Sequence, residues 1–488
     1  MRKQLWLGIL CAVLCIACLV MGWLEHSSVC GLQVLSKDKL LKMTENMDYV
    51  RTAEGIDELL QFEGYTIPYD KVTNTFYISQ DVKKRIYQGI ISAAVSNCEI
   101  YIEETENVYS KERTISKGSI LRVWILAGDT YTKCNLIFSG IPILALDSEL
   151  QSDYSHGKIV LYNPDDTELK QMSIKTSAAE VKKNLSSGTV TVKLCKDNYL
   201  DERKLSLLAM GKERSWKLYT VSDKDDTCVR AMMAAEIWNT VTRDKRKVRP
   251  YQFVEVITNH EYAGLYLMAP KVTPSYLKLP EGSDLYSYEE NNTFAVVDEE
   301  VSGETQEKVR EYIEWLGKEK NVINSFDLNS YVDYHIFSQV IYGVKNIAES
   351  KYLIAEPMKD HMVYSVMPER LEYGFGCLPN SLEYLSWQGE GRVVEDVEYT
   401  LLCEEFAEEI IRNTTEYWDN LYDSTLSISQ MQKMAQKYEK ILFEGGYIER
   451  CGRAENYETA CENLNEYIND RMNALNHYFS NAGAKDEN

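Results

Sequence analysis

Residues 5–24 contain no charged side chain and are almost entirely apolar, with the sequence LWLGILCAVLCIACLVMGWL. At about 1.5 Å of rise per residue, a helix of this length spans the roughly 30 Å hydrocarbon core of a membrane. Arg2 and Lys3 precede the segment and Glu25 is the first charge after it, so the positive-inside rule places the short N-terminus in the cytoplasm. The sequence therefore predicts a single-pass cell-membrane protein whose C-terminal domains are extracellular.

A cleaved signal peptide is the alternative interpretation of this segment. The apolar stretch is longer than the about 7–15 residues of a signal-peptide core, and no A-x-A cleavage pattern follows it. We therefore expect residues 1–30 to remain on the protein as an N-terminal transmembrane helix.

The chain is long and strongly acidic. Its 488 residues exceed the size at which one hydrophobic core stops growing, which predicts two domains beyond the anchor. The formal net charge is -22, and no basic stripe offsets it. The composition therefore argues against nucleic-acid binding, and an acidic surface favours basic partners.

Apolar patterning divides the rest of the chain into a stalk, a β-rich domain and an α+β domain. Residues 31–69 are polar and helix-tending, which is typical of a linker. Residues 70–171 contain short apolar runs separated by turn residues, which indicates a small β-sandwich. Residues 172–480 combine strand-like alternation with helical periodicity, and residues 481–488 form a tail.

The last eighty residues carry the clearest helical pattern of the chain. The segment SISQMQKMAQKYEKILFEGG places Met431, Met434 and Tyr438 on one face and stops at a glycine pair. We expect this face to pack into a core.

The spacing of the cysteines does not reveal a disulfide pattern. Eight of the twelve lie singly beyond residue 31, without a C-x-x-C pair or a histidine cluster, so the sequence predicts no metal site. A disulfide outside the cell, for instance between Cys98 and Cys134, stays open because sequence alone cannot pair cysteines.

Several motifs occur in an order that resembles one protein family. Trp216 lies on a predicted strand, and Asp226 and Arg230 follow at the start of a predicted helix. A predicted hairpin with the sequence NHEYAGLY comes next, at residues 259–266. Together these motifs resemble the spore coat protein H (CotH) kinase family over roughly residues 172–480.

The resemblance implies a fold and a chemistry. Members of the family have an atypical protein-kinase-like fold and can transfer phosphate from ATP to protein side chains, with acidic residues as base and metal ligands. An active member would therefore use ATP and Mg²⁺. The family's N-x-D and S-x-Y patterns, aligned on Ser350 and Tyr352, place Lys345 at the position of the catalytic aspartate.

The family's metal-binding pattern W-D-x-D is also altered. It falls on residues 369–372, where its two aspartates become Arg370 and Glu372. Cations at Lys345 and Arg370 would repel Mg²⁺, and a like-charge contact at about 4 Å costs several kcal/mol at an effective dielectric near 20. The resemblance thus implies a degenerate site of Lys345, Arg370 and Glu372, with no catalytic residue and no metal.

We predict that Glu372 pairs with Lys345 or Arg370, so that a protein cation replaces the lost metal. Three charged groups in one site are costly unless they are paired. The alternative is that these side chains are solvated surface charges.

Lys193 and Arg230 are candidates for a nucleotide pocket. Lys193 lies on a strand that matches the nucleotide-contacting strand of the family, and a structural role is the alternative. Arg230 begins a predicted helix, where it could equally pair with Asp223, Asp225 or Asp226.

Together these observations predict a membrane-anchored, extracellular CotH-like pseudokinase that acts as a binding or scaffold protein of the cell envelope or spore surface. Its partners would be proteins at the cell surface or spore coat and, through the N-terminal helix, the membrane; no cofactor is expected. An active atypical kinase that transfers phosphate from ATP to surface proteins is one alternative. Cell-wall or carbohydrate binding through the β-sandwich is another, suggested by Trp124 and the many tyrosines, which could equally be core aromatics.

Overall fold

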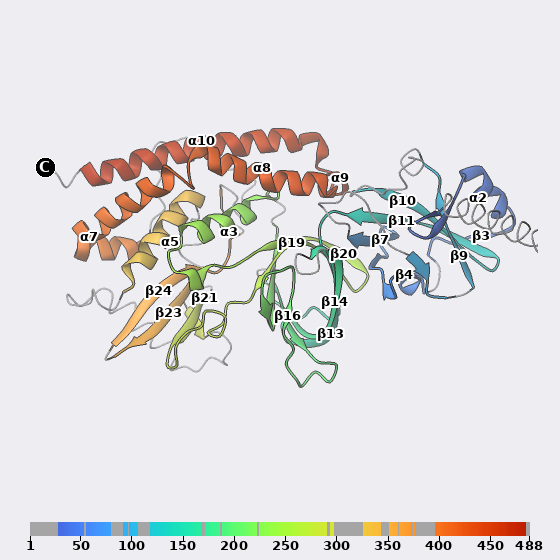
Figure 1. Cartoon of the computed structure of the whole chain (residues 1–488), viewed down its shortest axis with the longest axis horizontal. Helices are drawn as coiled ribbons and strands as arrows, with labels where there is room; N and C mark the ends of the chain where they lie inside the picture. Colours follow the sequence, from blue (N-terminus) through green and yellow to red (C-terminus); the bar gives the residue numbers. More distant parts are fainter. Residues whose placement is uncertain are drawn as a thin grey trace, which may run out of the picture.

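The structure is a computed structural model of mixed α+β architecture. It describes residues 28–484, apart from 53–54, 80–90, 96, 106–117, 167–170, 186–187, 222–223, 290–292, 297–325, 343–350, 360, 372–373 and 376–395. Three parts lie in a row: an N-terminal β unit, a β-barrel, and a layer of helices with a four-stranded sheet at the far end (Figure 1).

The N-terminal unit has an eight-stranded sheet and a three-stranded sheet. The order of the larger sheet is β1-β2-β9-β10-β11-β7-β6, with β3 also paired to β11, and that of the smaller is β5-β4-β8. Side chains from both sheets, such as Phe62 and Val123, pack into one core. The strands are β1 Ser28–Val29, β2 Leu32–Leu35, β3 Asp48–Tyr49, β4 Leu60–Phe62, β5 Tyr65–Thr66, β6 Tyr69–Asp70, β7 Thr75–Ser79, β8 Ile91–Ala93, β9 Cys98–Glu103, β10 Ile120–Ala127 and β11 Thr130–Ser139.

Residues 31–69 belong to this unit and do not form the predicted stalk. They supply strands β2 to β5, helix α2 (Lys37–Met43) and the 3-10 turn η1 (Ile56–Glu58). The strands are only two to four residues long, so they carry no alternation that a sequence pattern could reveal.

Trp124 on β10 is a core residue. Its side chain is fully buried beside Leu40 of α2, and its ring stacks on Tyr131 at 5.6 Å between centroids. The indole nitrogen donates to Glu103 Oε2 at 2.8 Å. Of the two roles that the sequence left open for Trp124, the structure shows the core aromatic.

The central part is a closed barrel in the order β12-β13-β14-β15-β18-β20-β19. Its strands alternate as the sequence predicted: Val190, Val192 and Leu194 of β15 point into the barrel core. The expected domain boundary at 171/172 falls inside this barrel, because β13 and β14 pair along most of their length. The strands are β12 Ile143–Ser148, β13 Ser155–Asp166, β14 Gln171–Lys183, β15 Val190–Cys195, β18 Ser215–Thr220, β19 Gln252–Thr258 and β20 Glu261–Pro270, and a small two-stranded sheet consists of β16 Leu205–Ser206 and β17 Lys212–Glu213.

Helices cover the upper side of the barrel and the four-stranded sheet (Figure 1). The predicted helical face of α8 is confirmed, since Met431, Met434 and Tyr438 are buried. The sheet has the order β22-β21-β23-β24. The elements are α3 Arg230–Val241, η2 Lys245–Lys247, β21 Asp284–Glu289, β22 Thr293–Val296, α5 Leu328–Ile341, β23 Lys351–Met358, β24 His361–Pro368, α7 Val397–Tyr422, α8 Ile428–Glu444, α9 Tyr447–Arg450 and α10 Ala454–Ala484.

A buried polar group joins the three parts, and we call Glu255, Arg450, Ser139 and Tyr262 the junction cluster. Arg450 on α9 donates to Glu255 Oε2 on β19 at 2.6 Å, and Tyr262 on β20 donates to Glu255 Oε1 at 2.6 Å. Ser139, at the end of β11 in the N-terminal unit, donates to the same carboxylate. Glu255 has no exposed surface, so this carboxylate binds all three parts together.

The predicted anchor, residues 5–24, lies outside the described residues. In the described part of the chain, no helix is long and apolar enough to cross a membrane. Cys98 and Cys134 are both free thiols, so the disulfide left open by the sequence is not formed.

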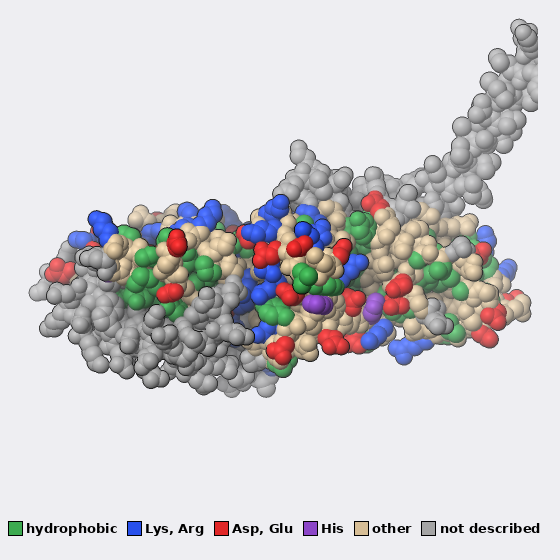
Figure 2. All heavy atoms as spheres, turned by 90° about the horizontal axis from the view of Figure 1, so that it is seen from below, with side chains coloured by type: hydrophobic (Ala, Val, Ile, Leu, Met, Phe, Trp, Pro, Cys, Tyr) green, Lys and Arg blue, Asp and Glu red, His purple; other side chains and the backbone are tan. Residues whose placement is uncertain are grey.

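The surface charge is uneven despite the net charge of -22. Lys and Arg side chains gather near the middle of the face shown in Figure 2, with Asp and Glu side chains among them. The acidic composition therefore does not make every face of the protein acidic.

Candidate functional site

The outer face of β18 points toward the segment that follows β24. Trp216 and Leu218 point into the barrel core, so Lys217 between them points outward. Its ammonium lies 2.8 Å from Glu369 Oε1, and Tyr352 of β23 donates to the same oxygen at 3.3 Å. Lys217 and Glu369 are only 15% and 12% exposed, so this ion pair is largely shielded from water.

The charge of Lys217 is maintained by its partner. Burial by itself lowers the pKa of Lys217, but the neighbouring Glu369 carboxylate outweighs this effect and raises that pKa well above its usual value. The lysine is therefore an ammonium ion at neutral pH.

A second cation, Arg249, lies beside the same group of residues. Its side chain is fully buried; Nε donates to the Pro270 carbonyl at 2.7 Å, and Nη1 donates to the hydroxyls of Tyr219 and Tyr251 at 2.9 and 2.8 Å. The remaining nitrogen, Nη2, is buried and has no hydrogen-bond partner among the described residues. Burial raises the pKa of Tyr251, so this phenol stays neutral and cannot balance the guanidinium charge.

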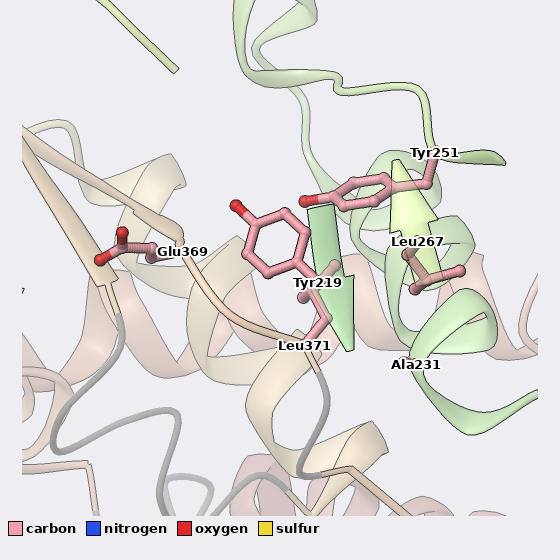
Figure 3. Close-up of a pocket in the computed structure, with 6 residues that line it drawn as sticks. All are labelled: Tyr219, Ala231, Tyr251, Leu267, Glu369 and Leu371. Carbon is pink, nitrogen blue, oxygen red and sulfur yellow. The ribbon is translucent and has the colours of Figure 1, made fainter. Parts of the chain in front are cut away.

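These side chains border a small pocket, which we call the tyrosine pocket. It is lined by Tyr219, Ala231, Tyr251, Leu267, Glu369 and Leu371. It is narrow, and no water molecule fits between these side chains. Figure 3 shows the hydroxyls of Tyr219 and Tyr251 pointing toward the side on which the Glu369 carboxylate lies.

Two cations approach the ring of Tyr219. Lys217 Nζ lies 5.8 Å from the ring centroid, and Arg249 Cζ lies 5.2 Å from it. Among the described residues, Glu369 is the carboxylate paired with Lys217, and Arg249 has no carboxylate partner. The ring of Tyr219, which lines the pocket, therefore lies near two positive charges.

Lys345 and Glu372 of the predicted degenerate site lie outside the described residues. The pairing of Glu372 with Lys345 or Arg370 therefore stays a prediction. Arg370 itself is half-buried and lies between Glu369 and Leu371, both of which line the tyrosine pocket. The structure thus places Glu369 and Leu371 of the altered W-D-x-D segment at the tyrosine pocket. In the described part of this segment, Glu369 is the ion-paired carboxylate.

Lys193 does not line this pocket. It lies on the outer face of β15, where its ammonium is 4.3 Å from the ring centroid of Tyr154. The ring of Tyr154 also has Lys182 Nζ at 5.8 Å. This contact agrees with the structural interpretation of Lys193.

Arg230, the first residue of α3, is ion-paired with aspartates that directly precede this helix. Its Nη1 lies 2.6 Å from Asp225 Oδ1 and 2.7 Å from Asp226 Oδ1, and its backbone N–H donates to Asp225 Oδ2 at 3.0 Å. The ion pairs anticipated as the alternative for Arg230 are thus formed. The side chain is 2% exposed and is not part of the pocket lining.

Sequence reasoning missed Lys217 and Arg249. One signal for Lys217 was available, because a lysine between two inward-pointing residues of a strand must face outward toward whatever covers that strand. Arg249 precedes Pro250 in a loop and gave no periodic signal. Its burial depends on residues far away in the sequence.

A second polar cluster fixes the start of α7. His335 Nδ1 of α5 lies 3.5 Å from Asp396 Oδ2, and Lys351 Nζ of β23 lies 2.5 Å from Glu398 Oε2. Asp396 caps α7 by accepting the N–H of Tyr399 at 3.1 Å. Burial by itself raises the pKa of Asp396, but the neighbouring His335 and Lys351 and the N–H of Tyr399 outweigh this and lower the pKa.

No group of three or more His, Cys, Asp or Glu side chains that could hold a metal ion occurs within the ranges that the structure describes. Glu369 is the carboxylate of the altered motif that lies within those ranges, and it is already paired with a lysine.

Comparison with known proteins identifies the family. The family model described as CotH kinase protein matches residues 196–475, more than half of the chain. The chain belongs to the CotH family. This confirms the resemblance seen in the sequence, and the matched range runs from the end of β15 through most of α10. No curated protein matches the chain.

Proposed function

We propose that this CotH family protein is a membrane-anchored, extracellular pseudokinase that acts by binding, as a scaffold of the cell envelope or spore surface. The observation that carries the proposal is the ion pair between Lys217 and Glu369. It occupies one wall of the tyrosine pocket next to the altered W-D-x-D segment. The kinase-like fold implied by the family is part of the same proposal.

Phosphoryl transfer requires carboxylates that hold Mg²⁺ against the phosphates and orient the nucleophile. Glu369 is neutralised by Lys217 at 2.8 Å, and the motif positions for base and metal carry Lys345 and Arg370. Ligand pockets usually enclose roughly 300–1,000 Å³, whereas the tyrosine pocket has no room for a water molecule. Both the charges and the size of the pocket argue against Mg²⁺-ATP as a ligand.

The proposed location rests on the sequence. Twenty uncharged residues with Arg2 and Lys3 on the N-terminal side support an anchor whose C-terminal part is outside the cell. The proposed partners are proteins at the cell surface or spore coat, because the net charge of -22 favours basic protein surfaces over nucleic acid.

An active kinase is the second candidate, favoured by the description of the matching family as a kinase protein. In that case ATP and Mg²⁺ would bind with Glu372 as a remaining carboxylate ligand.

The test uses the full-length chain purified in mild detergent. We expect no phosphate incorporation from labelled ATP into the chain itself or into acidic and serine-rich proteins, with either Mg²⁺ or Mn²⁺. Calorimetric titration with ATP, with and without the metal, measures binding separately from transfer. Incorporation that is lost in a Glu372→Gln variant would overturn the pseudokinase proposal and establish the kinase.

A further inference from the structure

We infer that an open groove in the helical layer, which we call the α8 groove, is a binding site for an anionic polyol. By this we mean a compound that carries a carboxylate or phosphoryl group together with several hydroxyls. The groove is lined by α3, by α8 and by the turn that joins α7 to α8, and its volume is about 570 Å³. This lies within the roughly 300–1,000 Å³ of most ligand pockets. The inference goes beyond the proposed function, because the α8 groove shares no lining residue with the tyrosine pocket.

Helices α3 and α8 lie side by side in the helical layer (Figure 1), and a polar contact joins them at the groove. Glu236 Oε2 of α3 accepts from Lys437 Nζ of α8 at 2.8 Å and also from the hydroxyl of Tyr438. Lys437 Nζ lies 3.2 Å from the Tyr438 hydroxyl oxygen and 4.6 Å from the centroid of its ring. These contacts hold the ammonium group of Lys437 in place before any ligand binds, which lowers the entropic cost of binding.

A second cation, Lys433, lines the groove one turn before Lys437. The charged side chains of the lining are Lys433, Lys437 and Glu236, whereas Asp423, which follows α7, does not line the groove. Lys433 is exposed and has no ion-pair partner among the described residues. Like charges four residues apart destabilise a helix. An anionic group that contacts both ammonium groups relieves this repulsion.

The groove also offers hydrogen-bond acceptors. Thr240 Oγ1 of α3 donates to the Glu236 carbonyl at 2.8 Å, and Ser424 Oγ donates to the Asn420 carbonyl at 2.5 Å. A hydroxyl has one hydrogen and two lone pairs, so both oxygens have used their hydrogen and still accept. The groups of a ligand that contact these oxygens must therefore be donors, such as hydroxyls.

The ligand class follows from this combination of groups. Ammonium groups bind carboxylate or phosphate oxygens, and the hydroxyl oxygens of the groove accept from hydroxyls of the ligand. Met434, the apolar residue of the lining, is buried and offers a contact for the apolar face of a sugar ring. A peptide is a poorer fit, because peptides that bind in grooves usually anchor several apolar side chains.

The experiment is a calorimetric titration of the full-length chain, in a detergent without a sugar headgroup and at constant ionic strength. The probes are glucuronate, glucose 6-phosphate and neutral glucose. We expect the wild type to bind one or both anions about tenfold more tightly than glucose, because charge-assisted hydrogen bonds are stronger than neutral ones. The two anions distinguish a carboxylate ligand from a phosphoryl ligand. Glucose binding as tight as that of the anions, or no binding of either anion, would overturn the inference.

Lys433→Met tests whether the anion binds in the groove. Because Lys433 is exposed, the variant should fold, and the loss of one charge-assisted hydrogen bond should weaken anion binding about tenfold. Lys440→Met is the matched control, since Lys440 lies on the same helix, pairs with Glu444 and does not line the groove. We expect K440M to bind the anion as the wild type does. Equal affinities of K433M and K440M would reject the site.

Thr240→Val tests the contact with the hydroxyls of the ligand. The substitution keeps the shape of the side chain and removes the accepting oxygen, so the affinity for the sugar anion should fall about threefold. If T240V does not fold, Ser424→Ala removes the other accepting oxygen of this pair. An unchanged affinity in the folded variant would reject a polyol as the ligand.

Discussion

The junction cluster and the tyrosine pocket both contain a carboxylate that is ion-paired away from bulk water, but their surroundings differ. In the junction cluster, Glu255 has no exposed surface and pairs with one cation, Arg450. At the pocket, Glu369 keeps 12% exposure and pairs with Lys217, which is itself 15% exposed. The difference teaches that the first carboxylate is a confined structural link, whereas the second keeps contact with solvent.

The largest effect is expected from Arg450→Met in the junction cluster. The substitution leaves Glu255 buried without its cation, and breaking one side of a buried ion pair costs about 3–5 kcal/mol of unfolding free energy. Urea unfolding followed by fluorescence measures the loss. Lys440→Met is the control, because Lys440 is 71% exposed in its pair with Glu444. If R450M loses as little unfolding free energy as K440M, the Arg450–Glu255 pair is not a structural link.

Lys217→Met should destabilise the chain less, by about 1–3 kcal/mol. Glu369 can turn toward solvent when its partner is lost, which the fully buried Glu255 cannot do. The same urea experiment compares the two variants. If K217M loses as much unfolding free energy as R450M, Glu369 is as confined as Glu255, and the contrast between the two sites is wrong.

Asp396→Asn tests a third buried pair and should cost about 1 kcal/mol near neutral pH. Asparagine caps a helix as well as aspartate does, so the variant removes the charge that faces His335 and keeps the cap of α7. The folded-state pKa of Asp396 is lowered, so its stabilising effect is present above the unfolded value of about 3.9 and is lost as the pH falls through the folded pKa.

Melting temperatures measured from neutral to acidic pH should therefore converge for the wild type and D396N. A constant difference at every pH would show that the charge of Asp396 does not contribute.

The smallest effect is expected from Lys193→Ala. Its cation–π contact with Tyr154 is half-exposed, so the loss should be about 0.5 kcal/mol or less. Urea unfolding of K193A beside wild type measures the difference. A loss as large as that of K217M would contradict a surface role for Lys193.

Sequence periodicity predicted the strands and helices that bury one face against the rest of the protein. The alternation of β15 and the helical stripe of α8 were both found, because each reflects local geometry and burial of one side. The family was also recognised from motifs around β18, α3 and the β19–β20 hairpin. These features depend on spacing within a short segment.

Contacts between distant segments were not predictable from a single sequence. Arg450 and Glu255 are 195 residues apart, and Lys217 and Glu369 are 152 apart. A charged side chain looks the same in the sequence whether it meets a partner or solvent. Lys193, a predicted pocket residue, and Lys217, an unnoticed one, are both lysines on outward-facing strand positions, and only the fold distinguishes them.

The position of Glu255 on β19 has a consequence for how the chain unfolds. Strand β19 closes the barrel by pairing in parallel with β12, from which it is separated by more than one hundred residues. Such pairings form late, because the entropy of closing a long loop opposes them. Since Glu255 lies on this strand and contacts β11, β20 and α9, barrel closure brings the carboxylate to its partners in both flanking parts. The N-terminal unit and the C-terminal helices are therefore expected to lose their attachment in the same cooperative transition in which the barrel opens.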